Sequence, residues 1–512
     1  MSSSKSRYMI GALAGALVAG SAMAAAGLGV ADRPDAAAPA GAAASGPAPS
    51  FGPPPGAPMT FADIFEKVSP AVVSINVTTR VDLSKMPRQI PGLPFEFRAP
   101  GQGGDEDGDG EGPRGPRRQS AGSGFFISAD GFLVTNNHVI EDAETIKVVL
   151  KDETELEATV VGRDEGTDIA VLKVKGSGYT FVNFENSARP RVGDWVMTVG
   201  NPYNLGGTAT AGIVSAYGRD IGETFVDYIQ LDAPINRGNS GGPTFDTYGR
   251  VIGVNTAIFS PTGGSVGIGF AVPADVAARV SRQLIANGKV VRGYIGATIQ
   301  DFNEDMAAAQ GMAGQKGAIV AELTAGGPAQ RAGLATGDIV LSVNGTRVRS
   351  SSELTRQVAK AAPGDLLRLE VIRDGKPRTI DIRSGTRPSE SQLAASQGGP
   401  GGAPGPARPA PSAGQTLLGM TVAPLDEAAR RRTGLPAEVR GLLVSGVDRS
   451  SDAAAKGLQP NDVLMRAGDR VLNAPADLAA VVDLARKAGR PSVLVAVWRG
   501  GRTIFLPIKI AG

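Results

Sequence analysis

Residues 236–243 read NRGNSGGP and place Ser240 in a run with glycine at positions 238, 241 and 242. Glycines on both sides of a serine permit a tight backbone turn that exposes the hydroxyl and directs neighbouring amides toward one point. A nucleophilic serine needs such a turn, but an ordinary loop serine can also occupy one. The run also satisfies the G-x-S-x-G pattern of the nucleophile elbow in α/β-hydrolases. The segment therefore leaves three interpretations open, and residues elsewhere in the chain decide among them.

The chain contains a single histidine, His138, in VTNNHVI (134–140), so an imidazole base can only be this residue. An α/β-hydrolase has its histidine after the serine, and because no histidine follows residue 138 the elbow interpretation is excluded. Asp168, in GTDIAVLKV (166–174), completes the order His138, Asp168, Ser240, which is that of chymotrypsin-like enzymes. Taken singly, His138 could be a packed core residue and Asp168 a turn residue. Together, near strand ends, the three favour a protease cleft.

Composition excludes several other kinds of site. The 512 residues include no cysteine, which removes thiolate nucleophiles, disulfides, thiolate-bound zinc and iron–sulfur clusters. With one histidine, no multi-histidine metal site can form. Lysine and arginine number 52 against 50 acidic residues, and the net charge of +2 gives no basic field for nucleic acid. We expect an enzyme without cofactor, metal or nucleic-acid partner, built from three or four modules.

The region between about residues 71 and 272 alternates short β-rich runs with turn residues. Eleven or more such runs indicate a fold dominated by antiparallel β-structure, as a sandwich or barrel domain. Asp130-Gly131 predicts a hairpin with a two-residue type I′ turn, which needs positive φ at both positions. A helix from Pro273 to Ala286, with Gly288 as its C-cap, is expected to close this domain.

The N-terminal residues 1–30 have the order of a secretory signal: two basic residues, an uncharged apolar run (9–30), and small residues around Ala22-Met23-Ala24. The run is also long enough to span a bilayer, which takes about 20 residues. A cleaved signal peptide and a retained anchor giving membrane association through residues 9–30 are both open. Either way the chain is exported.

Two further segments are expected to lack regular structure. Residues 31–58, rich in Pro, Ala and Gly, predict a disordered tether. Residues 82–119 predict a long surface loop inside the β-rich region. Asp105, Asp107 and Asp109 begin like a calcium loop, but Pro116 stands where the bidentate Glu is needed, so a solvated acidic loop is the preferred interpretation.

The C-terminal part of the chain repeats itself. GGPAQRAGLATGDIVLSVNGTRV (326–348) recurs as SSDAAAKGLQPNDVLMRAGDRV (450–471), with Gly333 and Gly457 at matching positions. Two copies of one module are therefore expected. Residues 386–415, rich in Ser, Gly, Pro and Ala, predict a flexible linker between them.

The runs around the three candidate residues, together with GRVIGVNTAI (249–258) and GIGFAVP (267–273), resemble the HtrA (Deg/Do) family of trypsin-like serine proteases. The resemblance runs from about residue 60 to 511. It implies a chymotrypsin-like double β-barrel protease domain at 59–288, followed by PDZ domains at 289–385 and 416–512. It also implies a periplasmic location, a homotrimer or larger homo-oligomer, and degradation of unfolded or damaged envelope proteins.

By this resemblance His138 is the general base, Asp168 orients it, and Ser240 attacks the scissile carbonyl. The backbone of Gly238, Asn239 and Ser240 is expected to form the oxyanion hole.

The same resemblance implies which residues bind the substrate. In trypsin-like enzymes the residue six positions before the nucleophile floors the primary pocket. Here that residue is Pro234, followed by Ile235, so a small aliphatic substrate side chain such as Val, Ile or Ala is expected. The remaining expected substrate-binding residues, which would pair with an extended substrate backbone, are Gly267, Ile268, Gly269 and Phe270.

Tyr294-Ile295-Gly296-Ala297 resembles the PDZ loop whose amides bind a terminal carboxylate. The second copy keeps a loop at Leu417-Leu418-Gly419-Met420, but Asn461-Asp462 replaces Gly337-Asp338, which leaves peptide binding there open. Unfolded polypeptides and C-terminal peptides are the expected partners. The alternative function is a holding chaperone or PDZ scaffold whose protease is silent until activated.

Overall fold

The computed structural model describes residues 60–80, 117–184, 190–201, 207–236, 238–261, 264–389, 392–393 and 414–510. Several predicted segments lie outside these residues: the leader (1–30), the tether (31–58), the acidic run 105–109 and most of the linker (386–415). Residues 117–119, expected in the long loop, instead begin strand β2 (Arg117–Phe126). In the part of the chain described, no helix has the length and apolarity to cross a bilayer.

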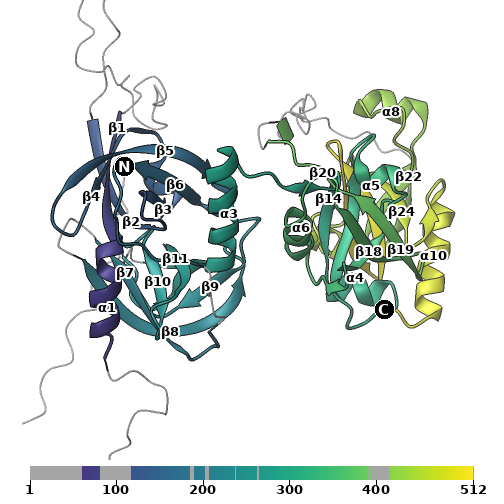
Figure 1. Ribbon diagram of the computed structural model, residues 1–512. Coiled ribbons are helices and arrows are strands. Elements are labelled where there is room, and N and C mark those ends of the chain that lie inside the picture. Colours follow the sequence, from purple (N-terminus) through teal and green to yellow (C-terminus); the bar gives the residue numbers. More distant parts are fainter. Residues whose placement is uncertain are drawn as a thin grey trace, which may run out of the picture. The chain divides into compact units, whose positions relative to one another are not determined.

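The β-rich region forms two closed six-stranded barrels, which confirms the predicted double-barrel architecture (Figure 1). The first has strand order β1-β2-β3-β6-β5-β4 and the second β10-β11-β12-β9-β8-β7. The further strands of the first barrel are β1 (Val72–Arg80), β3 (Phe132–Thr135), β4 (Ala143–Val149), β5 (Glu155–Asp164) and β6 (Ile169–Val174). Those of the second are β7 (Trp195–Gly200), β8 (Thr208–Arg219), β9 (Tyr228–Leu231), β10 (Pro243–Asp246), β11 (Val251–Ile258) and β12 (Gly269–Pro273).

Strands β2 and β3 form the hairpin that was expected around Asp130-Gly131, but its turn differs from the prediction. The Ile127 amide donates to the Phe132 carbonyl at 2.9 Å, so the loop has four residues rather than two. Only Gly131 has positive φ, at 98°. A type I′ turn needs positive φ at both central residues, so that part of the prediction was wrong.

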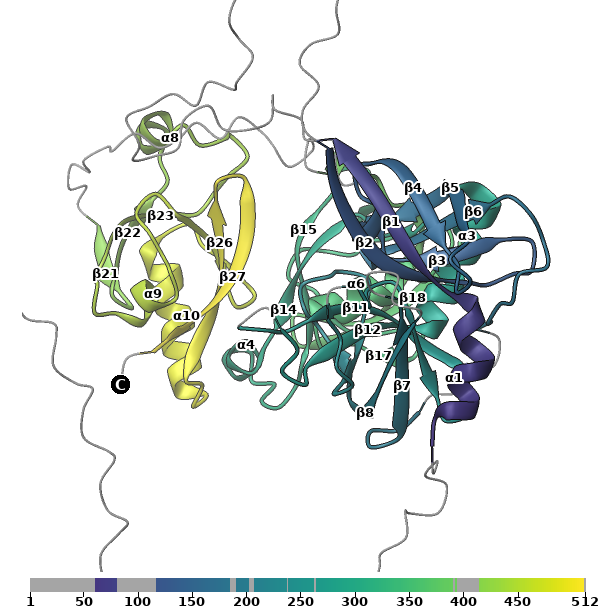
Figure 2. The same ribbon diagram turned by 90° about the vertical axis from the view of Figure 1, so that its left-hand side faces the viewer.

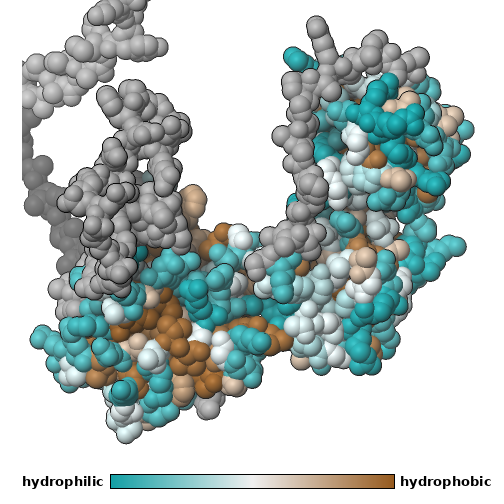
Figure 3. Space-filling view, turned by 90° about the horizontal axis from the view of Figure 1, so that it is seen from above, coloured by the Kyte–Doolittle hydropathy of each residue, from teal (hydrophilic) through white to brown (hydrophobic). Residues whose placement is uncertain are grey.

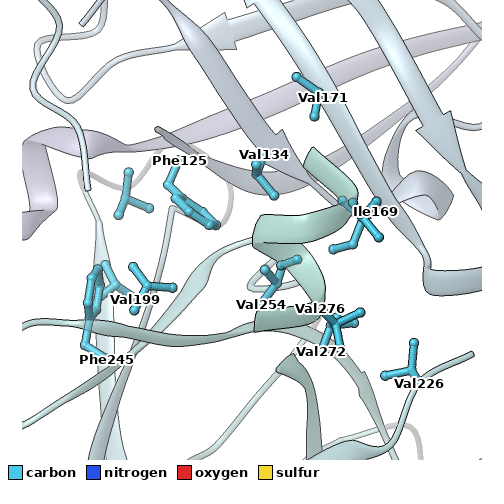
Figure 4. Packing of buried hydrophobic residues seen from close by; sticks show 14 of the residues in the cluster. Phe125, Val134, Ile169, Val171, Val199, Val226, Phe245, Val254, Val272 and Val276 are labelled. Atoms are coloured by element: carbon cyan, nitrogen blue, oxygen red, sulfur yellow. The ribbon is translucent and has the colours of Figure 1, made fainter. Parts of the chain in front are cut away.

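A single apolar cluster joins the two barrels. Phe125, Val134 and Ile169 of the first barrel meet Phe245 and Val254 of the second, all of them buried (Figure 4). Helix α3 (Ala274–Asn287) adds its own apolar side chains and ends at Gly288, whose φ of 68° is that of the predicted C-cap. Close packing of this kind holds the facing ends of the barrels in a fixed relation.

Short helical segments complete the first half of the described chain. They are α1 (Ala62–Val68), the 3₁₀ turns Ser69–Ala71 and Glu165–Thr167, and α2 (Asn137–Ile140). Phe61, Ile64 and Phe65 at α1 pack against the cluster that joins the barrels.

Two modules with similar strand order follow, as the repeat predicts. The first contains β13 (Gly293–Tyr294), β14 (Ala297–Phe302), α4 (Glu304–Ala309), β15 (Gly317–Leu323), α5 (Pro328–Arg331), β16 (Ile339–Val343), β17 (Thr346–Arg347), α6 (Ser351–Ala359), β18 (Leu366–Arg373), β19 (Lys376–Arg383) and β20 (Gly385–Thr386). The second, seen in Figure 2, contains β21 (Gln415–Leu417), β22 (Met420–Pro424), α8 (Glu427–Thr433), β23 (Leu442–Val447), α9 (Asp452–Ala455), β24 (Val463–Ala467), β25 (Arg470–Val471), α10 (Pro475–Lys487), β26 (Ser492–Arg499) and β27 (Arg502–Lys509).

The two modules also share an ion pair between an arginine and a buried aspartate. In the first, the Arg373 guanidinium donates to both carboxylate oxygens of Asp338 at 2.6 Å. In the second, Arg499 does the same to Asp462 at 2.6 and 2.5 Å. Each arginine also donates to the carbonyl of the glycine that marks the repeat, Gly333 or Gly457, at 2.7 Å. The repetition seen in the sequence is thus a repetition of structure.

Candidate active site

His138 and Asp168 are held together by two hydrogen bonds. The imidazole Nδ1 lies 2.6 Å from Asp168 Oδ2, and the backbone amide of His138 donates to Oδ1 at 2.9 Å. The His138 side chain is 46% exposed and that of Asp168 only 14%. A carboxylate that holds Nδ1 leaves the other ring nitrogen, Nε2, available for proton transfer. The pair can therefore act as a base and its orienting acid.

The position of Asp168 requires a special backbone conformation. Asp168 follows the 3₁₀ turn Glu165–Thr167 and has φ 54° and ψ 38°, in the left-handed region. For a residue other than glycine this conformation costs roughly 1–2 kcal/mol. It persists where the surroundings determine it, and such strain is often found at functional sites. The turn places the Asp168 carbonyl where the Asn137 amide donates to it at 3.1 Å.

Ser240 lies in the connection between β9 and β10, and the glycine run lets this connection fit against the first barrel. The Ser123 amide donates to the Ser240 carbonyl at 2.8 Å. Gly241 has φ 85°, and a Cβ there would lie 2.2 Å from the Ser123 carbonyl oxygen. The Ser240 hydroxyl donates to the Thr256 carbonyl at 3.3 Å. In this rotamer the hydroxyl is not hydrogen-bonded to His138, so proton transfer to the imidazole needs a rotation of the serine side chain.

Asn136 connects the two halves of the site, and sequence reasoning did not single it out. Its side-chain nitrogen donates to the Asp168 carbonyl at 2.8 Å and to the Thr256 hydroxyl at 3.1 Å. Asn136 is fully buried, and Thr256 accepts the Ser240 hydroxyl through its carbonyl. One amide, just before His138, therefore binds both Asp168 and the strand that lies beside Ser240. Its position two residues before His138 was the only signal in the sequence.

The expected oxyanion-hole residues surround the same turn. Gly238 has φ 103°, a value open to glycine, and its carbonyl accepts the Ser123 hydroxyl at 2.5 Å. The Asn239 amide donates to the Asn236 carbonyl at 3.0 Å. No described residue accepts a hydrogen bond from the amide of Gly238 or Ser240. Two such amides are the donors that an oxyanion needs.

Tyr228 is a further buried group near the acid. Its side chain is fully buried, and its hydroxyl has no hydrogen-bond partner among the described residues. Burial raises the pKa of Tyr228, and the negative charges of Glu223 and Asp168 raise it further. The phenol therefore stays neutral at physiological pH.

The residues expected to line the primary pocket lie in different environments. Pro234 is exposed, and its carbonyl accepts the Thr210 hydroxyl at 2.8 Å. Ile235 is buried, and its Cδ1 lies 2.8 Å from where a Cβ on Gly269 would stand. Phe270 packs in the cluster that joins the barrels, in an edge-to-face contact with Tyr228. Of these residues, Ile235 is therefore the apolar side chain that lies against the backbone of Gly269, where no side chain covers it.

The expected pairing of a substrate strand along 267–271 does not fit the sheet. Residues 269–271 pair with β11 on one side and with β9 on the other, so their backbone has no free edge. Ala257 and Ile258 of β11 pair only with β12, and Thr256 lies at the bulge before them, because β10 pairs with 251–254. The open edge beside Ser240 is thus that of Thr256–Ile258.

Comparisons with known proteins agree with this geometry. Residues 122–254 match the model of the trypsin-like peptidase domain, and residues 293–383 that of the PDZ domain. The chain is 41% identical over 479 residues to a probable periplasmic serine endoprotease DegP-like of Rhizobium meliloti (strain 1021), covering 88% of this chain and 92% of that protein. A protein of the same description from Brucella suis is also 41% identical, over 485 residues and 90% of each chain.

The chain belongs to the HtrA family of DegP-like serine endoproteases. The solved structure of the HtrA-type protease AlgW with decapeptide is 37% identical, with a TM-score of 0.53, and covers 65% of this chain and 100% of its own. The chain is accordingly a serine endopeptidase. Within the described residues no group of three or more acidic, histidine or cysteine side chains could hold a metal ion.

In the first PDZ module of this HtrA-family chain, the loop Tyr294–Ala297 leaves two amides free, those of Ile295 and Gly296. The carbonyls of Ile295 and Gly296 accept from Ala329 at 2.7 Å and from Thr324 at 2.9 Å. No described residue accepts from the amide of Ile295 or Gly296. Strand β14, which follows, is an edge strand of its sheet. Free loop amides beside an open strand edge are what capture of a peptide C-terminus requires.

The second module differs at this position. Residues Leu417–Met420 form a tight hairpin in which Leu418 has φ 52° and Gly419 φ 74°. The hairpin folds β21 onto the edge of β22, with Gln415 opposite Val422. Leu417 and Leu418 pack against the core cluster that includes α10. The chain's own strand thus occupies the edge that a peptide would use.

Proposed function

We propose that this endopeptidase cleaves by acyl transfer through Ser240, with His138 as general base and Asp168 as its orienting acid. The two hydrogen bonds between Asp168 and His138, at 2.6 and 2.9 Å, carry this proposal. Rotation of the Ser240 hydroxyl from the Thr256 carbonyl toward Nε2 starts the reaction. The amides of Gly238 and Ser240 stabilise the oxyanion that forms on the scissile carbonyl.

The substrate is an extended polypeptide that pairs with the backbone of Thr256–Ile258. This open edge leads to Ser240, because the Thr256 carbonyl accepts its hydroxyl. A substrate held by backbone pairing must be unfolded locally, since a folded segment has already used its backbone groups. Ile235 beneath Gly269 favours a small aliphatic side chain before the scissile bond. Unfolded or damaged periplasmic proteins meet both requirements.

Exposed apolar side chains support both substrate binding and self-association. In Figure 3 apolar surface gathers on the part of the molecule that carries the barrels. Among the exposed large apolar residues of the barrel region are Trp195, Tyr248, Phe259 and Val266. Large exposed apolar patches mark interaction sites. We propose assembly into a homotrimer or larger homo-oligomer through exposed apolar residues of the barrels, and sedimentation of the purified chain tests the oligomeric state.

Cleavage of an unfolded model protein tests the proposed mechanism. Wild type is expected to produce fragments and to be inactivated by a serine-directed phosphonate, whereas Ser240→Ala is expected to lose several orders of magnitude in turnover. Ser281→Ala, which removes a buried hydroxyl from α3, is the matched control and should retain activity. Fragments formed by Ser240→Ala at the wild-type rate would refute the proposal.

A further inference from the structure

Arg292, in the segment between α3 and β13, forms a bidentate ion pair with Asp164 at the end of β5. Its Nη1 donates to Oδ1 at 2.8 Å and its Nη2 to Oδ2 at 2.5 Å. The side chains are only 13% and 8% exposed. A buried ion pair offsets its desolvation only when the geometry is good, and removal of one partner leaves a buried charge uncompensated. This pair therefore fixes the positions of the two segments that it joins.

Asp164 is the residue from which the turn carrying Asp168 departs. The Thr167 hydroxyl donates to Asp164 Oδ2 at 2.5 Å, and the Asp168 amide donates to the Glu165 carbonyl at 3.2 Å. Asp164 thus binds Arg292 on one side and the end of the 3₁₀ turn on the other. The left-handed Asp168 comes directly after this turn.

Phe225 covers the same turn from the β8–β9 connection. The Arg292 guanidinium carbon lies 4.2 Å from the centre of the Phe225 ring, a cation–π contact. A Cβ on Gly166, in the middle of the turn, would lie 2.6 Å from that ring. The turn is enclosed between an arginine and an aromatic ring, and neither touches the reacting atoms.

We propose that Arg292 is a positioning residue of the catalytic triad, which holds the turn that presents Asp168 to His138 through its ion pair with Asp164. The inference rests on the proposed function of these residues. Both Asp168 oxygens bind His138, at 2.9 and 2.6 Å, so a small displacement of the turn lengthens two hydrogen bonds at once. A less well oriented carboxylate stabilises the imidazolium less, which slows the chemical step more than it weakens substrate binding.

The single histidine gives a direct measurement. In full-length protein labelled with carbon-13 at histidine Cε1, the one imidazole signal reports on His138 alone. With Arg292→Gln we expect kcat to fall by about 10- to 100-fold with KM little changed, and the chemical shift of the signal to change because the hydrogen bond between Nδ1 and Asp168 lengthens. Asp164→Asn should give the same changes, and the double variant should be no worse than either single one. Arg292→Lys keeps the positive charge but cannot form the bidentate pair with Asp164, so it should recover part of the lost kcat.

A purely structural role gives a different result. Arg373→Gln breaks an ion pair of the same bidentate form inside the first PDZ module, and is expected to lower the unfolding temperature without changing kcat or the chemical shift of the histidine signal. The inference is wrong if Arg292→Gln and Arg292→Lys, assayed well below their unfolding temperatures, both keep the wild-type kcat and the wild-type histidine chemical shift. Those results would leave the proposed mechanism intact as long as Ser240→Ala is inactive, so the two failures are distinguishable.

Discussion

The side-chain amide of Asn136, in the first barrel, donates to the hydroxyl of Thr256, in the second, at 3.1 Å. The same nitrogen donates to the Asp168 carbonyl, and the Thr256 carbonyl accepts the Ser240 hydroxyl. Asp168 and Ser240 are therefore connected through two residues, Asn136 and Thr256, whose side chains have no part in the proposed chemistry. The barrels are joined here by polar contacts as well as by the apolar cluster beneath.

Asn136→Ala should weaken this connection. Two hydrogen bonds are lost and the Thr256 hydroxyl loses a donor, so we expect a loss of about 1–3 kcal/mol in the free energy of unfolding. Because Asp168 and the strand beside Ser240 lose a shared contact, kcat/KM should fall about 10- to 100-fold. Denaturant unfolding and peptide hydrolysis measure the two effects. Asn76→Ala, on β1 and outside the site, is the control and should leave kcat/KM unchanged.

Ile235→Ala should enlarge the primary pocket, because the Ile235 side chain fills the space beneath Gly269. Each methylene that a pocket gains or loses changes discrimination by about 1–3 kcal/mol. We expect cleavage after Leu or Phe to increase at least about tenfold relative to cleavage after Val, as measured by fragment mapping. Pro234→Ala, at the exposed neighbour, should not change the ratio; a shift with that variant instead would assign the pocket to Pro234.

Tyr228→Phe removes a buried hydroxyl that has no partner among the described residues. Without a hydrogen bond to lose, the variant should be as stable as wild type or up to about 1 kcal/mol more stable. The pKa of Tyr228 is raised in the folded protein from an ordinary value of 10.0, so the folded state keeps its proton above the pH at which the unfolded chain loses it. Wild type should therefore lose stability above about pH 10 more steeply than Tyr228→Phe. The free energy of unfolding is measured by denaturant at pH 9 and at pH 11 for both proteins. An equal loss between these pH values in wild type and Tyr228→Phe would contradict the burial argument.

Calorimetry with a C-terminal peptide should give one binding site per chain. The first PDZ module has free loop amides and an open β14 edge, whereas β21 covers β22 in the second. A peptide with an amidated C-terminus should bind far more weakly, because the loop amides need a carboxylate. Gly414→Val, whose Cβ would stand 2.7 Å from Thr421 Cγ2, should displace β21 and raise the number of sites toward two. Two sites in wild type would show that β21 does not block the second module.

The sequence predicted the antiparallel β-structure and the repeated modules because their signals are local, whereas the double barrel was implied by the resemblance to the HtrA family. Alternating apolar runs mark strands, and turn residues separate them. The Asp130-Gly131 hairpin was found in the same way, but its turn type was not, since the backbone of Asp130 follows from how β2 and β3 meet. Similarly, the order of neighbours around β12, which removes the expected substrate edge, follows from how the barrel closes.

The proposed catalytic residues could be chosen from the sequence because there was no alternative base: the chain has one histidine, no cysteine, and an order of residues that fits one class of enzyme. The residues that surround them could not be predicted from the sequence. Only the tertiary structure shows three of these contacts: the hydrogen bond of Asn136 to Thr256, the ion pair of Arg292 with Asp164, and the pairing of β21 with β22. The first two join residues more than a hundred positions apart, and the third depends on how a hairpin is seated between a strand and a helix. No local pattern records such contacts, because they arise when packed elements are brought into register.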